Sequence, residues 1–272
     1  MADLPPFRLE DRQVETLVAG DAETWIVVPA LDEARSIGAT LAALRVQAFR
    51  PFVVCVVDNG SRDGTINAVL HWADSGRASD PSLGVRLAHE PERGTGAAAD
   101  TGMRLAIAAG ARYLLRTDAD SLPRDDWAGR MVHRLSTGTD LVAGKMVDRP
   151  DECLGVPTRL LLYLLTLISA VISVPKNRGA GYRTRFRMLV GSNVGITAAT
   201  YAASGGFPRS RIDELHDDRA LMNRVRRVTH RIASDHRAVV ATSARRYRAY
   251  GLRGVIDWYL NHDAHGAPVV VR

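Results

Sequence analysis

Short apolar runs alternate with helical patterns through the first part of the chain, and this alternation constrains the fold more than any other feature. Four apolar runs predict strands, at residues 25–28, 52–57, 85–88 and 112–115. Three stretches of helical character separate them, at residues 34–48, 65–73 and 94–109. This order predicts a parallel sheet with right-handed crossovers and with helices on both of its faces.

The pattern is looser after Leu122. Two further helices and three short strands are expected there, at residues 125–136, 214–227, 141–143, 189–190 and 238–241. No internal repeat or low-complexity tract divides the chain. We therefore predict an α/β fold with one continuous domain, in which a Rossmann-like, mainly parallel half continues into a mixed half.

Composition narrows the class of protein. Apolar residues make up 46% of the 272 residues, which is enough to bury a large core. The net charge is +6, and all of the 36 basic residues except Lys145 and Lys176 are arginines. Such a balance fits arginine-rich codon usage with solvated faces, and it also fits affinity for anions such as diphosphates, acidic acceptors or a membrane surface. The small number of aromatic residues disfavours nucleic acid.

The cysteines and the first residues predict a cytoplasmic protein. Residues 1–22 are polar and charged and do not resemble a signal peptide. Cys55 lies inside an apolar run and is expected in the core. With Cys153 as the only other cysteine, neither a disulfide framework nor a zinc spacing is present in the sequence.

One apolar stretch raises the question of a membrane. Residues 160–174 carry no charge over 15 residues, whereas a spanning helix needs about 20. A buried helix and an interfacial helix both fit this stretch, and arginines flank it. Peripheral contact with anionic lipid through residues 155–187, at the inner face of the membrane, is therefore one expectation.

Acidic residues follow three of the predicted strands. Asp32 and Glu33 follow the first strand, Asp58 the second, and Asp118 and Asp120 the fourth. The carboxyl ends of parallel strands meet at one edge of a sheet, where ligands of α/β folds bind. Because Mg²⁺ is usually shared between one or two carboxylates and substrate phosphates, Asp118 and Asp120 predict a seat for a metal–diphosphate.

Several of the other polar residues fit either a structural or a chemical role. Ser61 and Asp63 are expected to cap the turn after the second strand and the helix that follows it. Asp58, directly after the strand, is expected to contact a base or a ribose hydroxyl. Asp217 and Asp218 precede near-helical spacing, so favourable charge at a helix N-terminus and a catalytic role both fit them.

Six motifs, in this order and spacing, resemble family 2 glycosyltransferases: VVPALDE, VVDNGSRDGT, TDADSLP, GSNVGI, GGFP and DDRAL. The resemblance covers about residues 23–250. It implies a GT-A fold with an N-terminal extension at 1–22, a nucleotide-sugar-binding half at 23–122 and an acceptor-binding half at 123–272. It also implies inverting transfer of one sugar from a nucleoside-diphosphate sugar, of UDP or GDP type, to a hydroxyl acceptor.

On the donor side, the resemblance assigns roles to five residues. Pro29, Glu33 and Asp58 would line the pocket for base and ribose, Asp118 would contact the ribose or the metal, and Asp120 would hold Mn²⁺ or Mg²⁺ on the diphosphate.

On the acceptor side, Asp217 and Asp218 stand where the family has Glu-Asp, so Asp218 would be the general base. The same resemblance puts four residues near the transferred sugar: Gly205, Gly206, Phe207 and Asn193. The acceptor would be a small molecule or lipid-linked, and a homodimer is compatible with the pattern.

The chain departs from the family in several places. Residues 98–102 read Ala-Ala-Asp-Thr-Gly where the family often has a basic residue and an asparagine, and Arg93 is the candidate substitute. The Gln-x-x-Arg-Trp motif of processive synthases is missing, which favours transfer of a single sugar. His262 is a candidate third metal ligand, with a polar helix end as the alternative. Residues 245–246 are two arginines that fit a diphosphate clamp or a basic turn.

Features of the sequence disfavour three other functions. A sugar nucleotidyltransferase would need a glycine-rich loop after the first strand, where residues 30–33 read Ala-Leu-Asp-Glu. A dinucleotide oxidoreductase is disfavoured because residues 94–96, Gly-Thr-Gly, follow the third strand and lack the third glycine of the fingerprint. A catalytically inert binding module is disfavoured by the presence of Asp118, Asp120 and Asp218.

Overall fold

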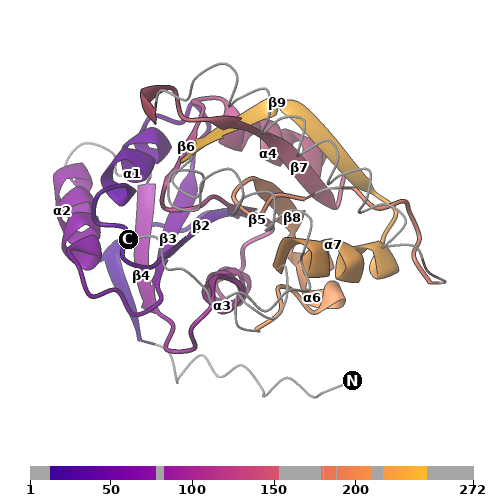
Figure 1. Cartoon of the computed structure of the whole chain (residues 1–272), viewed down its shortest axis with the longest axis horizontal. Helices are drawn as coiled ribbons and strands as arrows, with labels where there is room; N and C mark the ends of the chain where they lie inside the picture. The colour runs from indigo at the N-terminus through magenta and orange to yellow at the C-terminus, as the bar shows by residue number, and fades with distance from the viewer. Residues whose placement is uncertain are drawn as a thin grey trace, which may run out of the picture.

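A nine-stranded sheet with helices on both faces forms the body of the protein (Figure 1). The computed structural model describes residues 13–77, 83–152, 179, 181–187, 189–209 and 217–243. The strand order in these ranges is β1-β4-β3-β2-β5-β8-β7-β9-β6. This confirms the predicted α/β fold. The apolar stretch at 160–174, Cys153 and the arginines at 245–246 lie outside the described residues.

The first half of the sheet is parallel, as predicted. Its strands are β2 (Thr24–Ala30), β3 (Phe52–Asp58), β4 (Leu83–His89) and β5 (Tyr113–Arg116). They are connected by α1 (Ile37–Arg45), α2 (Thr65–Arg77) and α3 (Thr95–Ala108). Ala30 pairs in register with Asp58, and Asp58 with His89, so the carboxyl ends of these strands are level.

The second half is mixed. β5 pairs antiparallel with β8 (Val194–Thr197), which pairs antiparallel with β7 (Leu141–Asp148). Beyond β7 follow β9 (Ile232–Thr242), parallel to it, and β6 (Ser121–Pro123), antiparallel to β9. The helical elements are α4 (Trp127–Ser136), the 3₁₀ turn η2 (Pro150–Glu152), α6 (Ala198–Ser204) and α7 (Asp217–Val228).

The structure differs from the sequence predictions in four elements. Residues 14–18, expected within an extension, form β1 (Val14–Val18), an edge strand antiparallel to β4. The strand expected near residues 189–190 is wrong, because the chain turns there through a bond from the Asn193 amide to the Val190 carbonyl (2.9 Å), and β8 begins at Val194. Helix α6 was not predicted, and neither was β6.

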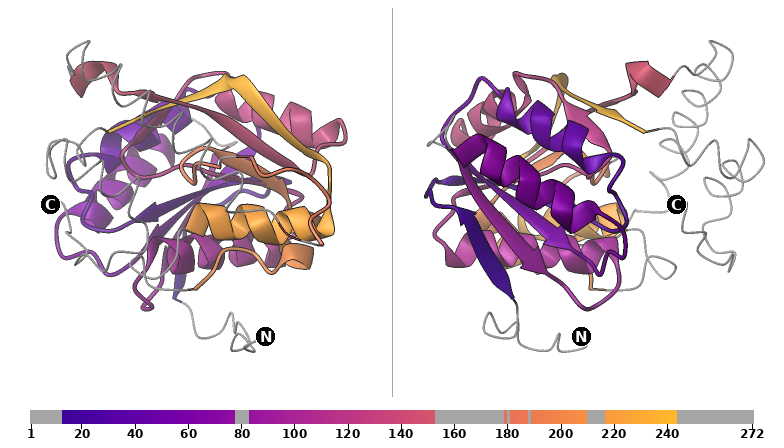
Figure 2. Two further views of the ribbon diagram at one scale, coloured as in Figure 1. Left: turned by 45° about the vertical axis from the view of Figure 1, so that its right-hand side comes forward. Right: turned by 90° about the vertical axis from the view of Figure 1, so that its left-hand side faces the viewer.

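Alternate residues of the strands supply two separate layers of core. Ile26 and Val54 point into one layer with α1, α2 and α4, while Val27 and Cys55 point into the other with α3, α6 and α7. Figure 2 shows these helices on opposite sides of the sheet. Cys55 is fully buried, which confirms the predicted core position, and this burial raises its pKa to about 12. None of the helices within the described ranges is both long enough and apolar enough to span a bilayer.

Candidate active site

Two loops at the carboxyl edge of the sheet are fastened together. The β2–α1 loop and the β3–α2 loop share four hydrogen bonds between backbone amides and short polar side chains. These run from Asp32 N to Ser61 Oγ (3.0 Å), Arg62 N to Asp32 Oδ1 (2.7 Å), Glu33 N to Thr65 Oγ1 (2.7 Å) and Ala34 N to Asp63 Oδ2 (3.0 Å). The expected structural roles of Ser61 and Asp63 are confirmed, and the loop that carries Glu33 is held in one position.

Asp58 ends β3 and is engaged by its own turn. Its carboxylate accepts hydrogen bonds from the backbone amides of Gly60 (3.1 Å) and Ser61 (3.2 Å). The Nδ1 atom of His89, the register partner of Asp58 on β4, lies 3.3 Å from Asp58 Oδ2. The Asp58 side chain is only 4% exposed, whereas that of His89 is 44% exposed. His89 is therefore the more accessible polar group at this edge, and sequence reasoning did not select it.

A buried arginine organises the end of β5. The guanidinium of Arg116 donates to Asp118 Oδ1 from Nε (3.3 Å) and Nη2 (3.2 Å). Its Cζ atom lies 4.8 Å from the centre of the Phe207 ring, which is fully buried. The Arg116 side chain is 3% exposed, while Asp118 is 34% exposed and accessible from the carboxyl edge. Phe207, predicted to lie under the sugar, thus packs directly beneath the Arg116–Asp118 pair.

The N-terminus of α7 brings Asp217 and Asp218 to the same arginine. A β-carbon on Gly191 would lie 2.2 Å from Asp218 Oδ1 and 3.0 Å from Arg116 Nη1. A β-carbon on Gly96 would lie 2.7 Å from Asp217 Oδ1. These two glycines therefore leave the space that the acid pair occupies. Asp118, just after β5, and the acid pair that begins α7 are about 100 positions apart in the sequence. In the fold they meet around Arg116.

The charges in this cluster shift two pKa values. Burial raises the pKa of Asp217 to about 7, an effect that the Arg116 charge opposes and the Asp218 charge reinforces. For Arg116, burial would lower the pKa, but the carboxylates of Asp118, Asp218 and Asp217 raise it above its ordinary value. Arg116 Nη1 and Asp217 Oδ1 are both buried without a hydrogen-bond partner. The cluster holds three acids against one fixed cation.

Few of the described side chains at this edge could act as ligands of a metal ion. Asp120 is 9% exposed, and its Oδ1 accepts a hydrogen bond from Ser121 (3.3 Å). Among the described residues, no three His, Cys, Asp or Glu side chains are grouped to hold a metal ion, and His262 lies outside these residues. Asp118 and Asp120 thus supply hard carboxylate oxygens but no complete cage, which fits a cation that completes its shell with diphosphate oxygens.

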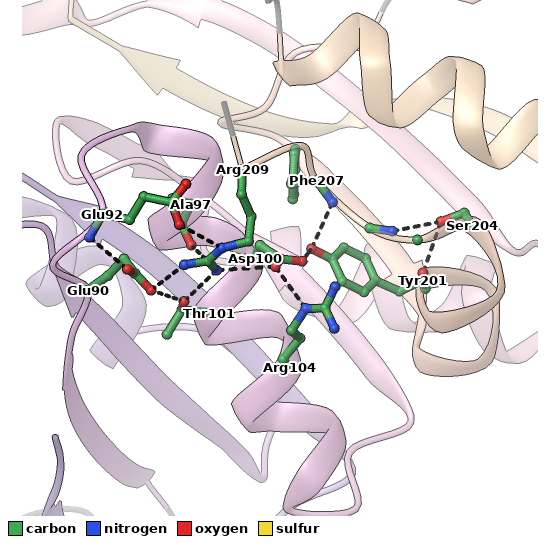
Figure 3. A network of polar contacts seen from close by, with 12 residues as sticks. Glu90, Glu92, Ala97, Asp100, Thr101, Arg104, Tyr201, Ser204, Phe207 and Arg209 are labelled. Atoms are coloured by element: carbon green, nitrogen blue, oxygen red, sulfur yellow. Dashed lines mark hydrogen bonds and ion pairs between the residues drawn. The ribbon is translucent and has the colours of Figure 1, made fainter. Parts of the chain in front are cut away.

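A second arginine ties the two halves of the protein together (Figure 3). Arg209 contacts Glu90 (Nη2 to Oε2, 2.8 Å), Glu92 (Nε to Oε2, 3.0 Å) and Asp100 (Nη1 to Oδ2, 3.3 Å). The Glu90 and Asp100 side chains are fully buried. Asp100, the residue that departs from the family pattern, also accepts a bond from the Tyr201 hydroxyl (2.9 Å). Asp100 therefore has a structural role at the base of α3.

The predicted sugar-facing loop is rigidly supported. Gly205 (φ 79°) and Gly206 (φ 66°) both adopt backbone angles that favour glycine. A β-carbon on Gly206 would lie 2.6 Å from the Tyr201 ring. Arg224 of α7 donates to both glycine carbonyls (3.0 and 2.9 Å), and the Phe207 amide donates to the Tyr201 hydroxyl (3.0 Å).

The other predicted site residues fall into different places. Pro29 is buried within β2, Glu33 is 7% exposed in the fastened loop, and Arg93 is exposed in the β4–α3 connection. Asn193 is fully buried; its amide donates to the Lys145 carbonyl (2.9 Å) and the Ala238 carbonyl (3.0 Å). The side chain of Asn193 thus joins β7 to β9, and its engaged amide gives no support to the expected sugar contact.

Sequence reasoning missed Arg116, Arg209 and Gly96. Arg116 had a detectable signal, because it is a charged residue at the end of an otherwise apolar predicted strand, next to Asp118. Arg209 and Gly96 had none, since their contacts come from segments more than 90 residues away, as in the pairing of Arg209 with Asp100.

Comparison with known proteins identifies the family. The model of glycosyl transferase family 2 matches residues 25–192, which is more than half of the chain. The chain therefore belongs to glycosyl transferase family 2. The matched range includes β2 to β5, the Asp118–Asp120 segment and Gly191.

A curated relative supports the assignment. Glycosyltransferase AglE of Haloferax volcanii is 32% identical over 124 residues, which cover 44% of this chain and 38% of AglE. The match thus spans well under half the length of that relative.

Solved structures share the fold at low identity. Mannosyltransferase PcManGT from Pyrobaculum calidifontis, in complex with GDP-Man and Mn²⁺, has a TM-score of 0.60 at 23% identity, over 92% of this chain and 68% of that one. S. aureus TarS has a TM-score of 0.57 at 16% identity, over 89% and 40%. Glucosyl-3-phosphoglycerate synthase from Mycobacterium tuberculosis, in complex with Mn²⁺, UDP and glucosyl-3-phosphoglycerate, has a TM-score of 0.52 at 17% identity, over 88% of this chain and 79% of that one.

Proposed function

We propose that this protein transfers a single sugar, with inversion, from a nucleoside-diphosphate sugar to a hydroxyl acceptor, and that Asp218 is the general base. The observation that carries the proposal is the meeting of two acidic sites around Arg116. One site follows β5 at the edge where ligands of α/β sheets bind, and the other begins α7. A single displacement needs a group that stabilises the leaving diphosphate and a base that accepts the proton of the attacking hydroxyl. These two groups must stand on opposite sides of the transferred sugar.

On the donor side, Asp118 and Asp120 would hold Mn²⁺ or Mg²⁺ together with the diphosphate. When bound, the cation would stabilise the charge that develops on the leaving diphosphate. Asp58, Pro29, Glu33 and Arg93 are the proposed contacts for base, ribose and diphosphate. β3 lies two strands from β5, about 10 Å away at the usual strand spacing. This separation is compatible with a nucleoside diphosphate that extends from Asp118 toward Asp58. Mn²⁺ and nucleotide in structures of similar fold support the same arrangement.

On the acceptor side, Asp217 and Asp218 lie in different environments, which suggests different roles for them. Burial makes Asp217 hard to ionise, which leaves Asp218 as the acid better suited to accept the hydroxyl proton. Asp218 is partly exposed, and its carboxylate lies against Gly191, where a β-carbon would displace it. Asp218 also lies close enough to the buried Arg116 guanidinium to raise the pKa of that arginine. Gly205, Gly206 and Phe207 form the supported floor on which the sugar would rest.

The acceptor is proposed to be a small molecule or a lipid-linked hydroxyl compound, in the cytoplasm or at the inner face of a membrane. Transfer of one sugar at a time and a homodimeric state remain predictions. A sugar nucleotidyltransferase and an inert binding module are the rival functions that the following experiment separates from the proposal.

The test combines nucleotide binding with donor turnover. Thermal shift with UDP or GDP should show stabilisation that depends on Mn²⁺, and a panel of nucleotide sugars should identify a donor that is hydrolysed. Asp120→Ala should lose the metal-dependent shift. Asp218→Asn should keep the shift and lower transfer or hydrolysis at least about 100-fold, the usual minimum for loss of a general base. Asp74→Asn, at an exposed position on α2, is the matched control.

Three results would contradict the proposal. Wild-type turnover by Asp218→Asn would remove the base assignment. Nucleotidyl transfer to a sugar phosphate, with release of pyrophosphate, would favour the nucleotidyltransferase. Stabilisation by nucleotide without any turnover of donors, in wild-type protein and in Asp218→Asn alike, would favour the inert module.

A further inference from the structure

The segment before Gly191 has a regular pattern of exposure. From residue 181 to residue 187 the chain reads Gly-Tyr-Arg-Thr-Arg-Phe-Arg and contains no helix or paired strand. Arg183, Arg185 and Arg187 are exposed, while the side chains between them are partly buried. Such alternation is characteristic of an extended chain with one face on the protein and one face in solvent. All three exposed positions carry the same charge.

Helix α7 holds this segment in place through Arg226. The Arg183 amide donates to the Arg226 carbonyl (2.8 Å), and Arg226 Nε donates to the Thr184 carbonyl (3.0 Å). The Arg226 guanidinium, in a residue only 3% exposed, lies 4.1 Å from the centre of the Tyr182 ring and 5.6 Å from that of Phe186. The inward side chains are therefore fixed, and the outward arginines are presented from an anchored backbone.

Among the residues that the structure describes, the outward arginines have no counter-charges. Within the described ranges, no carboxylate lies at ion-pair distance from Arg183, Arg185 or Arg187. Exposed Arg227 adds a fourth positive charge to this face, since its guanidinium lies 5.5 Å from the Tyr182 ring centre. Surfaces that have no partner usually intersperse both signs of charge. We call these four residues the arginine face.

We propose that the arginine face docks on an anionic lipid bilayer. Charge complementarity supports this partner, because basic residues beside a membrane bind acidic headgroups. In the sequence, the face follows closely after the uncharged run at 160–174, which also favours lipid. Single-stranded nucleic acid is the weaker alternative, since it binds through exposed aromatic platforms, and the rings of Tyr182 and Phe186 are covered by Arg226.

If the proposed function holds, docking through the arginine face would bring the acid pair of α7 near the membrane. Arg226 is nine residues along α7 from Asp217, so these two residues are about 14 Å apart along the helix axis. From Arg187 the chain runs on to Gly191, beside Asp218. A docked molecule would thus keep its acid pair within about 1.5 nm of the lipid headgroups, a distance suited to an acceptor hydroxyl on a lipid-linked molecule. Docking itself does not require transferase activity.

Vesicle flotation tests the proposal independently of catalysis. The full chain should float with vesicles of phosphatidylcholine that contain about 30% phosphatidylserine, and not with pure phosphatidylcholine. Raising the salt from about 0.05 M to about 0.5 M should release it. The triple variant Arg183→Gln/Arg185→Gln/Arg187→Gln should lower the partition coefficient about 100-fold, since each basic residue near an anionic surface strengthens binding about fivefold. A triple lysine variant at the same positions should retain binding.

The matched control removes equal charge elsewhere. Arg112→Gln/Arg134→Gln/Arg237→Gln neutralises three other exposed arginines and should leave flotation within about threefold of wild type. Equal loss in both triple variants would overturn the proposal in favour of a general charge effect. Absence of flotation at low salt, or binding of single-stranded RNA in preference to the anionic vesicles, would also overturn it. None of these outcomes depends on whether the proposed sugar transfer is found.

Discussion

Asp217 is a carboxylic acid whose burial outweighs a neighbouring positive charge. Its residue is 9% exposed, and one carboxylate oxygen has no hydrogen-bond partner. Arg116 provides attraction, but that guanidinium already serves Asp118 and also lies near Asp218. One cation shared among three acids leaves Asp217 with a pKa of about 7. The residue is therefore poised to change its charge near neutral pH.

This pKa predicts a pH-dependent penalty on stability. The folded protein keeps Asp217 protonated up to about pH 7, whereas the unfolded chain ionises it near the ordinary pKa of 3.8. The folded state therefore binds the extra proton between these limits, and stability falls as the pH rises through this window. We expect this residue to lower the unfolding free energy by roughly 2–4 kcal/mol between pH 4 and pH 8.

Urea denaturation of wild type and Asp217→Asn at several pH values measures the penalty. The variant should gain stability relative to wild type as the pH increases from 4 to 8, because its amide does not ionise. Asp125→Asn, at an exposed position, provides the comparison for removal of an acid without burial. A difference between wild type and Asp217→Asn that stays constant with pH would contradict the prediction.

At the scale of elements, Arg209 lies in the loop after α6 and binds carboxylates of helix α3 and of the loop between β4 and α3. Its three carboxylate partners come from the first half of the chain, while Arg209 belongs to the second. Burial alone would raise the pKa of Glu90, but hydrogen bonds from Thr101 and Arg209 bring it below its ordinary value. The elements are therefore held together by a buried cation whose removal leaves charge unbalanced.

Replacement of Arg209 should be strongly destabilising. Arg209→Met removes the counter-charge of Glu90 and Asp100, and we expect a loss of about 3–5 kcal/mol, the range for breaking a buried ion pair. Adding Glu90→Gln and Asp100→Asn should restore part of the loss. Chemical denaturation is the measurement, with Arg62→Met at an exposed position as control. A loss below about 1 kcal/mol would show that the pairing resembles a surface ion pair in strength.

The sequence predictions were accurate where consecutive residues determine an element, and less accurate where contacts between distant segments determine it. Strands β2 and β3 could be predicted because both faces are covered and their residues are continuously apolar. β1 is an edge strand with three exposed residues, and its sequence, Val-Glu-Thr-Leu-Val, is not a continuous apolar run. The second half was harder because its pairings join segments distant in the chain, as when β7 pairs with β9.

The candidate site followed the same rule. Asp118, Asp120 and Asp218 could be selected because they stand in motifs of consecutive residues. The contacts of Asn193 could not be predicted from such a motif, since only the fold reveals that its amide joins two strands. The space left by Gly96 and Gly191 becomes meaningful only when the first residues of α7 lie beside Arg116, which no local pattern encodes.

At the scale of the whole molecule, the continuous sheet predicts unfolding in one step. β5 pairs with β2 on one side and with β8 on the other, so both halves share a ladder of hydrogen bonds. Trp25 lies in the core layer with α3 and α7, while Trp127 lies in the layer with α1 and α4. Because neither layer can lose the sheet without exposing the other, the two should unfold together.

Variants that retain one tryptophan each can test this cooperativity. In one variant only Trp25 remains and in another only Trp127, with phenylalanine at the other three tryptophan positions. The fluorescence midpoint in urea should coincide with the circular dichroism midpoint within each variant. Separate midpoints, with the Trp127 transition earlier or later than loss of secondary structure, would indicate two independently unfolding units.

The pairing of β6 with β9 limits how such enzymes can be recombined. A junction between residues 122 and 123, where the donor and acceptor halves would be divided, cuts through β6. Its partners on β9 lie about 120 positions downstream, at Val240 to Thr242. A chimaera that takes its halves from two parents would therefore join mismatched strands at its seam, so new donor or acceptor preferences are better grafted as loops than exchanged as halves.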